Sequence, residues 1–226
     1  LDAFKHIEVL ADDSFEGRRA GSTGGHAAAG YIVNHLAEFG LTPAGEESYF
    51  QPFNKKYENC RNILAILPGK HPKLNEEIVA IGAHYDHVGQ RENGDIYNGA
   101  DDIASGTTGL WAIAEALTEY GTMKRTVMLM WVSAEEKGLL GSRAWTLDPW
   151  LPEGMKPFCN LNIDMIGRNA PDEIGITPTA SHPEYNRLTQ MVEEHCGKEG
   201  FTKLNNADAY WSRSDHANFA KNLKLR

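Results

Sequence analysis

The chain has 226 residues, a hydrophobic content of 41% and a formal net charge of -9 at pH 7. This composition is typical of a folded globular protein and argues against nucleic-acid or anionic-membrane binding. The three cysteines share no C-x-x-C spacing, which excludes a disulfide framework and a thiolate zinc site. The longest apolar run, 127–132, is far shorter than the about 20 residues that a membrane-spanning helix needs. We therefore expect one soluble domain over residues 1–226, without an inserted second domain.

Helical periodicity dominates the first part of the chain. Apolar residues at helical spacing predict a short helix near residues 4–10, followed by a loop. A longer helix is predicted to begin after Ser22 and to end before Gly40. His35 falls on the apolar face of that helix, where we interpret it as a packed residue rather than a metal ligand.

Strands and helices alternate in the rest of the chain. Helices are predicted before Gly121, over Leu139–Leu147, from a capping box at Ser181 and Glu184, and for one turn near Ser214. This alternation indicates an α/β fold with helices on both faces of a largely parallel sheet. The segments with strand composition are 49–53, 62–67, 77–81, 125–133 and 158–163.

Polar residues follow three of the predicted strands. His84 comes after the strand over 77–81, Glu135 and Glu136 follow the next one, and Asp164 follows the last. Ligands in open α/β sheets bind beyond the carboxyl ends of the strands, so we expect these side chains to meet. Imidazole and carboxylate groups without thiolates suit Zn²⁺. The sequence therefore predicts a metal site.

Two further carboxylate features extend this prediction. Asp101 lies in a Gly-Ala-Asp-Asp turn that would expose it between two metal ions, and a water held there would become a nucleophile near neutral pH. Glu135 and Glu136 would then have different roles. One would bind metal, and the other would take the proton of that water. Each residue alone is also compatible with a loop, a helix start or a cap, but the set together favours the metal site.

The motifs that carry these residues have a known counterpart. They are HYDH at 84–87, NGADDIASG at 98–106, SAEEKGLLGS at 133–142, NIDMIGR at 162–168 and SDHANFA at 214–220. The series resembles the M28 family of dinuclear zinc peptidases, and the loop Glu16-Gly17-Arg18 is similar as well. The resemblance implies a three-layer α/β/α sandwich with a mixed, largely parallel central sheet. Relatives continue with another core strand and a closing helix, which we expect this chain to lack.

The resemblance also implies a ligand set for two zinc ions per chain. Asp101 would bridge both ions, and the Asp101–Asp102 peptide would be cis. Catalysis would use Glu135 as general base and Asp86 to orient a metal-bound histidine. The expected metal ligands are His84, Asp101, Glu136, Asp164 and His216.

Three further residues have a structural as well as a functional interpretation. The family pattern gives His87 no ligand role, and we interpret it as a loop histidine. Arg168 and Tyr210 are candidates for substrate contact, but a surface or packing role is at least as compatible with the sequence.

The function that the resemblance implies is that of a zinc-dependent exopeptidase, an aminopeptidase that removes N-terminal residues from peptides. The expected partner is a peptide substrate, with no nucleic acid and no membrane, and the expected setting is extracytoplasmic. One alternative is an acyltransferase similar to glutaminyl cyclases, with one zinc and no water nucleophile. A second is a truncated metal-binding domain without catalysis.

Overall fold

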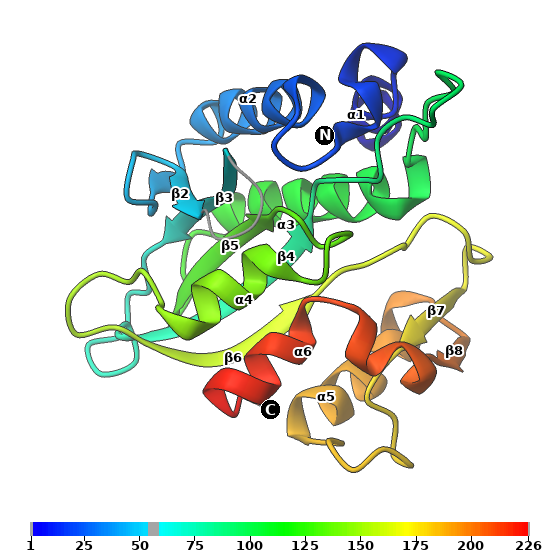
Figure 1. Cartoon of the computed structure of the whole chain (residues 1–226). Coiled ribbons are helices and arrows are strands. Elements are labelled where there is room, and N and C mark those ends of the chain that lie inside the picture. The colour runs from blue at the N-terminus through cyan, green and yellow to red at the C-terminus, as the bar shows by residue number, and fades with distance from the viewer. Residues whose placement is uncertain (1, 54–58, 226) are drawn as a thin grey trace.

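The computed structural model describes residues 2–53 and 59–225, which form helices on both faces of a central sheet (Figure 1). The strand order is β1-β3-β5-β4-β6, and β2 pairs with β3. Strand β4 runs parallel to β5 and β6, whereas the pairings of β3 are antiparallel, so the predicted mixed sheet is confirmed. The strands are β1 (Thr42–Pro43), β2 (Phe50–Phe53), β3 (Cys60–Leu67), β4 (Glu77–His84), β5 (Thr126–Val132) and β6 (Lys156–Asn162).

The helices divide between the two faces of the sheet. Helices α1, α2 and α3 cover one face, and α4 and α6 cover the other, which makes the three layers expected from the sequence (Figure 1). Side chains from β5 alternate between the two apolar clusters, because successive strand residues point to opposite faces. The helices are α1 (Ala3–Leu10), α2 (Thr23–Glu38), α3 (Gly106–Tyr120), α4 (Leu140–Leu147), α5 (Arg187–Cys196) and α6 (His216–Asn218).

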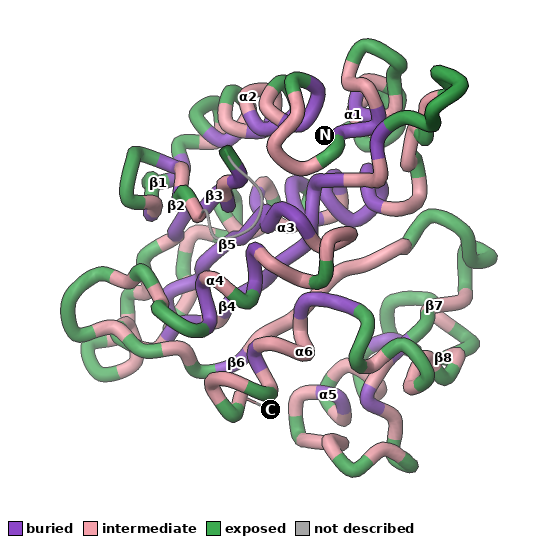
Figure 2. Tube along the Cα trace, viewed as in Figure 1, coloured by how far each residue is buried: buried purple, intermediate pink, exposed green. Residues whose placement is uncertain are grey.

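A smaller unit follows the central sheet in sequence. Strands β7 (Glu173–Ile176) and β8 (Lys203–Asn206) pair in parallel, and α5 lies between them in the chain. Figure 2 shows that this region is mostly half-buried or exposed, while the buried residues concentrate in the central sheet and the helices against it. The sequence did not predict this second sheet, because its strands lack the continuous apolar pattern of β5.

The predicted start of α5 at Ser181 is wrong. The helix begins at Arg187, where the Asn186 side chain accepts hydrogen bonds from the amides of Leu188 and Thr189. The Ser181 hydroxyl instead lies 3.0 Å from the Thr179 hydroxyl. A capping side chain six residues from the first helical residue cannot reach its orphan amides, so Asn186 takes that role.

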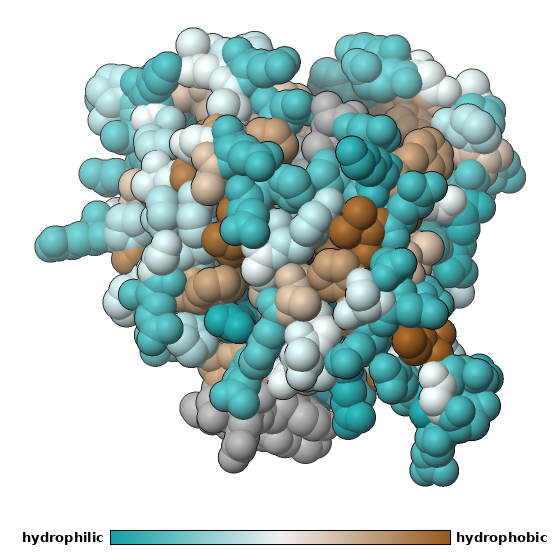
Figure 3. Space-filling model, turned by 90° about the horizontal axis from the view of Figure 1, so that it is seen from above, coloured by the Kyte–Doolittle hydropathy of each residue, from teal (hydrophilic) through white to brown (hydrophobic). Residues whose placement is uncertain are grey.

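The parallel strands bring their carboxyl ends to one edge of the sheet. His84 is paired in register with Val132, and Gly82 with Asn162, so the residues after β5 and β6 emerge beside His84. None of the helices in the described part of the chain has the length and hydropathy of a membrane span. Figure 3 shows the molecule from the side of α1 and α2, where hydrophobic side chains are scattered among hydrophilic ones.

Candidate metal centre

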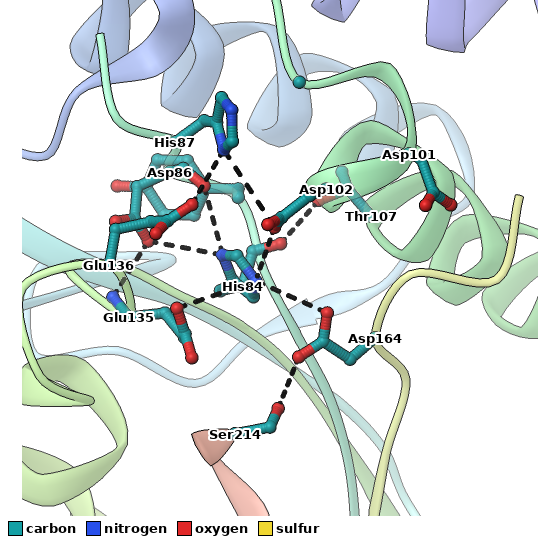
Figure 4. Close-up of polar contacts among 12 residues, drawn as sticks. His84, Asp86, His87, Asp101, Asp102, Thr107, Glu135, Glu136, Asp164 and Ser214 are labelled. Carbon is teal, nitrogen blue, oxygen red and sulfur yellow. Dashed lines mark hydrogen bonds and ion pairs between the residues drawn. The ribbon is translucent and has the colours of Figure 1, made fainter. Parts of the chain in front are cut away.

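The chain turns sharply after β5, and this turn presents two carboxylates. Ala134 has a φ of 58°, so the segment after Val132 leaves the strand direction. The amide of Glu135 then donates a hydrogen bond of 3.1 Å to Asp86 Oδ1, which holds the turn against the end of β4. Glu135 and Glu136 have thus left the strand. The Glu135 side chain lies beside His84, and the Glu136 side chain lies beside His87 (Figure 4).

His84 is the centre of a first group of ligand-type side chains. Its ring is 1% exposed, and Nε2 lies 3.5 Å from Asp102 Oδ1 and 3.7 Å from Asp164 Oδ1 (Figure 4). On the other side of the ring, Nδ1 lies 3.1 Å from the backbone carbonyl of Asp86 and 3.7 Å from its carboxylate. His84, Asp102 and Asp164 each offer one atom, and these atoms lie within 4.8 Å of one another.

A second group shares Asp102 with the first. His87 Nδ1 lies 2.7 Å from Glu136 Oε1 and 4.0 Å from Asp102 Oδ1. His87, Asp102 and Glu136 also each offer one atom, and these atoms lie within 4.8 Å of one another. The carboxylate of Asp102 therefore lies between two sets of ligand-type groups, which is the position that the sequence analysis expected for Asp101.

Asp101 points away from His84 and contacts a different loop (Figure 4). Its Oδ1 accepts a hydrogen bond of 2.7 Å from the Gly167 amide, and its Oδ2 pairs with the guanidinium of Arg168. The structure places Asp101 in neither group of possible ligands in the described chain. The expected cis peptide at Asp101–Asp102 is wrong, since the cis bond lies between Asp102 and Ile103.

His216, the other expected ligand, also lies outside the two groups. Its ring packs on Trp211 with centroids 4.5 Å apart, and burial lowers its pKa to about 4. Its Nε2 is buried and has no hydrogen-bond partner among the described residues. The preceding Ser214 donates a hydrogen bond of 2.6 Å to Asp164 Oδ2, which ties this segment to the first group.

Burial and close charges shift the pKa values of the site in opposite directions. Burial would lower the pKa of His84, but its contacts with Asp164 and Asp86 outweigh burial and raise the pKa well above the ordinary value. Burial raises the pKa of Glu135 to about 8. The hydrogen bond from His87 lowers the pKa of Glu136, so the two adjacent glutamates differ in acidity.

The donor set fits a divalent cation. Imidazole nitrogens and carboxylate oxygens are the ligands that Zn²⁺ takes when thiolates are absent. Several buried donor atoms lack a hydrogen-bond partner in the described chain, including Asp164 Oδ1 and His216 Nε2. Buried polar atoms are normally paired, so the unpaired Asp164 Oδ1 within the first group is compatible with a cation there.

Asp102 and His87 were not among the metal ligands expected from the sequence. Adjacent aspartates have the same chemistry, and which of them faces His84 depends on the turn that follows Gly99, with a φ of 61°, and on the contact of Asp101 with Arg168. His87 directly follows Asp86, but its orientation depends on the position of Glu136, far away in sequence. Of the two candidates for substrate contact, Arg168 is engaged by Asp101, and Tyr210 is 58% exposed.

Comparison with known proteins agrees with the fold and the motifs. The model of peptidase family M28 matches residues 62–224. A probable leucine aminopeptidase of Trichophyton verrucosum is 32% identical over 168 residues, which cover 71% of this chain and 43% of that protein. Leucine aminopeptidase 1 of Phaeosphaeria nodorum is 28% identical over 210 residues, or 85% of this chain and 51% of that protein. The chain therefore spans about half the length of these curated relatives.

Solved structures share the architecture at low sequence identity. A leucine aminopeptidase precursor from Bacteroides thetaiotaomicron superposes with a TM-score of 0.75 at 18% identity, over 99% of this chain and 81% of that one. Glutaminyl cyclase from Porphyromonas gingivalis superposes with a TM-score of 0.74 at 21% identity, over 99% and 80% of the two chains. These likenesses establish the fold, and the family model matches most of the sequence, so the chain belongs to peptidase family M28.

Proposed function

We propose that this chain is a zinc-dependent exopeptidase, and specifically an aminopeptidase that removes N-terminal residues from peptides. The observation that supports it is the position of Asp102, whose carboxylate belongs to both groups of ligand-type side chains. A carboxylate shared in this way suits a pair of cations, and paired metal ions are typical of aminopeptidases. The names of the curated relatives agree with this activity.

The two groups define which residues would hold each ion. His84, Asp102 and Asp164 would hold the first zinc ion, and Asp102 and Glu136 would hold the second together with a histidine. When bound, the zinc ions supply Lewis-acid activation of a water molecule and of the scissile carbonyl. Asp102 replaces Asp101 as the shared ligand in this proposal, because Asp101 is occupied by Gly167 and Arg168.

Two histidines are candidates for the last ligand position. His87 Nδ1 lies 2.7 Å from Glu136 Oε1, which supports His87 as the third group of the second site. The family resemblance gives that position to His216, whose buried and unpaired Nε2 among the described residues is also compatible with ligation. The geometry favours His87, and substitution of each histidine distinguishes the two.

Glu135 is the proposed general base. Its Oε2 lies 4.0 Å from His84 Nε2, so the carboxylate borders the first group without belonging to either group. It would take a proton from the water that attacks the peptide carbonyl and return that proton to the leaving amine. Asp86 is proposed to orient the centre, because it contacts His84 Nδ1 and accepts a hydrogen bond from the amide of Glu135.

A metal analysis combined with a substrate panel tests this function. The purified chain should contain two zinc ions and should hydrolyse leucine p-nitroanilide but not its N-acetyl derivative. A chelator should abolish turnover, and added Zn²⁺ should restore it. Glu135→Gln should lower kcat by about 100-fold or more with the zinc content unchanged. Glu153→Gln, on an exposed glutamate, serves as the control.

Other results would contradict the proposal. One zinc ion per chain, together with cyclisation of a peptide that begins with glutamine, would identify a glutaminyl-cyclase-like acyltransferase instead. If zinc raises the melting temperature but no peptide is cleaved, the chain is a metal-binding domain without catalysis. Equal kcat values for Glu135→Gln and the unchanged chain would remove Glu135 from the mechanism.

The cellular setting is a separate proposal. The family resemblance is the basis for an extracytoplasmic location, either periplasmic or secreted. Fractionation of the native organism, with an antibody against the chain, tests it. Recovery of the protein only with cytoplasmic markers would contradict it.

A further inference from the structure

Arg18 is buried beneath the metal centre, with a side chain that is 1% exposed. Its guanidinium donates hydrogen bonds to backbone carbonyls: Nε to Tyr85 at 3.1 Å and Nη2 to Gly99 at 2.7 Å. Nη1 adds a bond of 2.7 Å to the Asn98 carbonyl and another to the Leu10 carbonyl. One side chain therefore joins three segments that are far apart in sequence.

Two of these segments carry the proposed ligands. Tyr85 lies between His84 and Asp86, and Gly99 lies three residues before Asp102. The backbone around Arg18 reinforces this contact, since its carbonyl accepts a hydrogen bond of 3.2 Å from the His87 amide. Arg18 thus connects the residues after β4 with the turn that presents Asp102.

The contact is specific for the shape of an arginine. A guanidinium is planar and offers five donors in a rigid fork, whereas a lysine offers donors from a single nitrogen. Burying a charge is costly, and burial lowers the pKa of Arg18 to about 10, although the charges of Asp86 and Asp102 raise it. Arg18 also has a φ of 47°, in the left-handed region that is uncommon for residues other than glycine. A buried cation in this conformation indicates a role that a smaller apolar residue does not fulfil.

The adjacent glycines confirm how closely the segments approach. A Cβ atom on Gly17 would lie 2.5 Å from the Gly89 carbonyl oxygen and 2.6 Å from that of Tyr97. A Cβ atom on Gly99 would lie 2.6 Å from Arg18 Nη2 and 2.4 Å from the Asp102 carbonyl oxygen. The guanidinium therefore lies in direct backbone contact with the turn, with no room for an added methyl group.

We propose that Arg18 is a positioning residue for the metal centre, and that it fixes the distance between His84 and Asp102 by binding the carbonyls of Tyr85 and Gly99. This inference rests on the proposed zinc function. It concerns the geometry of the centre and assigns Arg18 no contact with substrate.

Electrostatics and positioning predict opposite effects of removing Arg18. A positive charge close to a cation site repels the cation, so loss of the charge alone should strengthen metal binding. Loss of the planar guanidinium should weaken metal binding, because the proposed ligands would no longer be held at the right spacing. Weaker binding in Arg18→Met therefore reports positioning rather than charge.

Cobalt binding to the whole purified chain tests the proposal without using peptidase activity. Co²⁺ would be titrated into the metal-free protein, and its visible absorption would give both the affinity and the ligand geometry. Arg18→Lys and Arg18→Met should each bind Co²⁺ about tenfold or more weakly, with an altered spectrum. Arg19→Met, on the adjacent exposed arginine, should match the unchanged chain in both measurements.

The remaining outcomes overturn the proposal. If both Arg18 variants bind Co²⁺ like the unchanged chain and only melt at a lower temperature, Arg18 serves the fold alone. The same conclusion follows if Arg18→Lys binds normally, or if the variants are recovered only as unfolded protein. If the unchanged chain binds no metal, the zinc function fails first, and the two failures are thereby distinguished.

Discussion

The carboxylate of Asp101 forms an ion pair with the guanidinium of Arg168, and this pair turns Asp101 away from the ligand groups. The next residue, Asp102, faces His84 at 3.5 Å. We therefore expect Asp102→Asn to lose most of the bound zinc, because an amide is a poor bridge between two cations. Asp101→Asn should keep the full zinc content. Elemental analysis of the purified variants measures this directly.

The two aspartates serve as controls for each other, since they are adjacent and undergo the same change. Loss of zinc from Asp101→Asn, with full zinc in Asp102→Asn, would reverse the assignment. Asp101→Asn should also lower the free energy of unfolding by about 1 kcal/mol or less, because Arg168 is 61% exposed and exposed ion pairs contribute little.

A second pair of matched variants, at His87 and His216, distinguishes the two candidates for the last ligand position. His87→Gln should weaken binding of the second zinc ion, because the imidazole lies 2.7 Å from Glu136. His216→Gln should have the smaller effect, because His216 lies outside both groups. Stepwise zinc titration by calorimetry would resolve the two binding events. A larger loss in His216→Gln than in His87→Gln would contradict the proposed role of His87.

A substitution at Gly99 tests whether the turn before Asp102 directs that residue toward the site. Gly99→Ala would introduce a Cβ atom 2.7 Å from His87 Cδ2 and 2.4 Å from the Asp102 carbonyl oxygen, so the turn must shift. We expect weaker zinc binding as well as lower stability. Gly94→Ala is the matched control, because Gly94 also has a positive φ, of 90°, but no atom lies within 4 Å of its added Cβ.

Both glycine variants carry the same kind of backbone strain, about 1 kcal/mol for alanine in a left-handed conformation. The difference between them therefore measures the contact at Gly99. Zinc affinities that are equal in Gly99→Ala and Gly94→Ala would show that the position of this turn does not affect the centre.

His6, which belongs to neither group of ligand-type side chains, is expected to make the stability of the fold depend on pH. Burial lowers the pKa of His6, and the nearby His35 and Lys5 lower it further. Asp2 acts in the opposite direction, but the net shift is downward. His6 Nδ1 also lies 2.8 Å from the Tyr31 hydroxyl. Because the unfolded chain binds the proton more tightly, this contribution to stability is present above pH 6.5 and is lost as the pH falls below it.

Thermal unfolding between pH 7.5 and pH 5 measures this dependence. The melting temperature of His6→Gln should fall less over this range than that of the unchanged chain. His195→Gln, on an exposed histidine of α5, should behave like the unchanged chain. An identical fall in all three proteins would assign the acid sensitivity to other groups.

Periodicity predicted most of the central fold. The apolar run of β5 and the helical faces of α2 and α3 are set by burial against neighbouring layers, and burial is what a hydrophobic pattern records. Similarly, the carboxyl ends of β4, β5 and β6 predicted the position of the site. The packed His35 is also found as expected, with its ring 5.4 Å from that of Trp111.

The structure differs from the sequence-based expectations where tertiary contacts decide between similar residues. Asp101 and Asp102 have identical side chains, and Arg168, which is distant in sequence, pairs with Asp101. The start of α5 depends on whether Ser181 or Asn186 caps the helix, and the competing hydroxyl of Thr179 engages Ser181. The contact of Asp101 with Arg168 joins residues that are distant in sequence, so a local sequence pattern does not predict it.

The parallel pairing of β4 with β5 and β6 also has a consequence for the lifetime of the folded chain. These pairings join residues 78–84 to 126–132 and 77–82 to 156–162, so the candidate ligands assemble only after long loops have closed. An unfolded chain does not offer a comparable site, and zinc at 100 times its Kd would stabilise the native state by about 2.7 kcal/mol. Contacts that form late in folding mainly slow unfolding. Zinc is therefore expected to act as a kinetic stabiliser that protects the chain against proteolysis, whether or not a substrate is present.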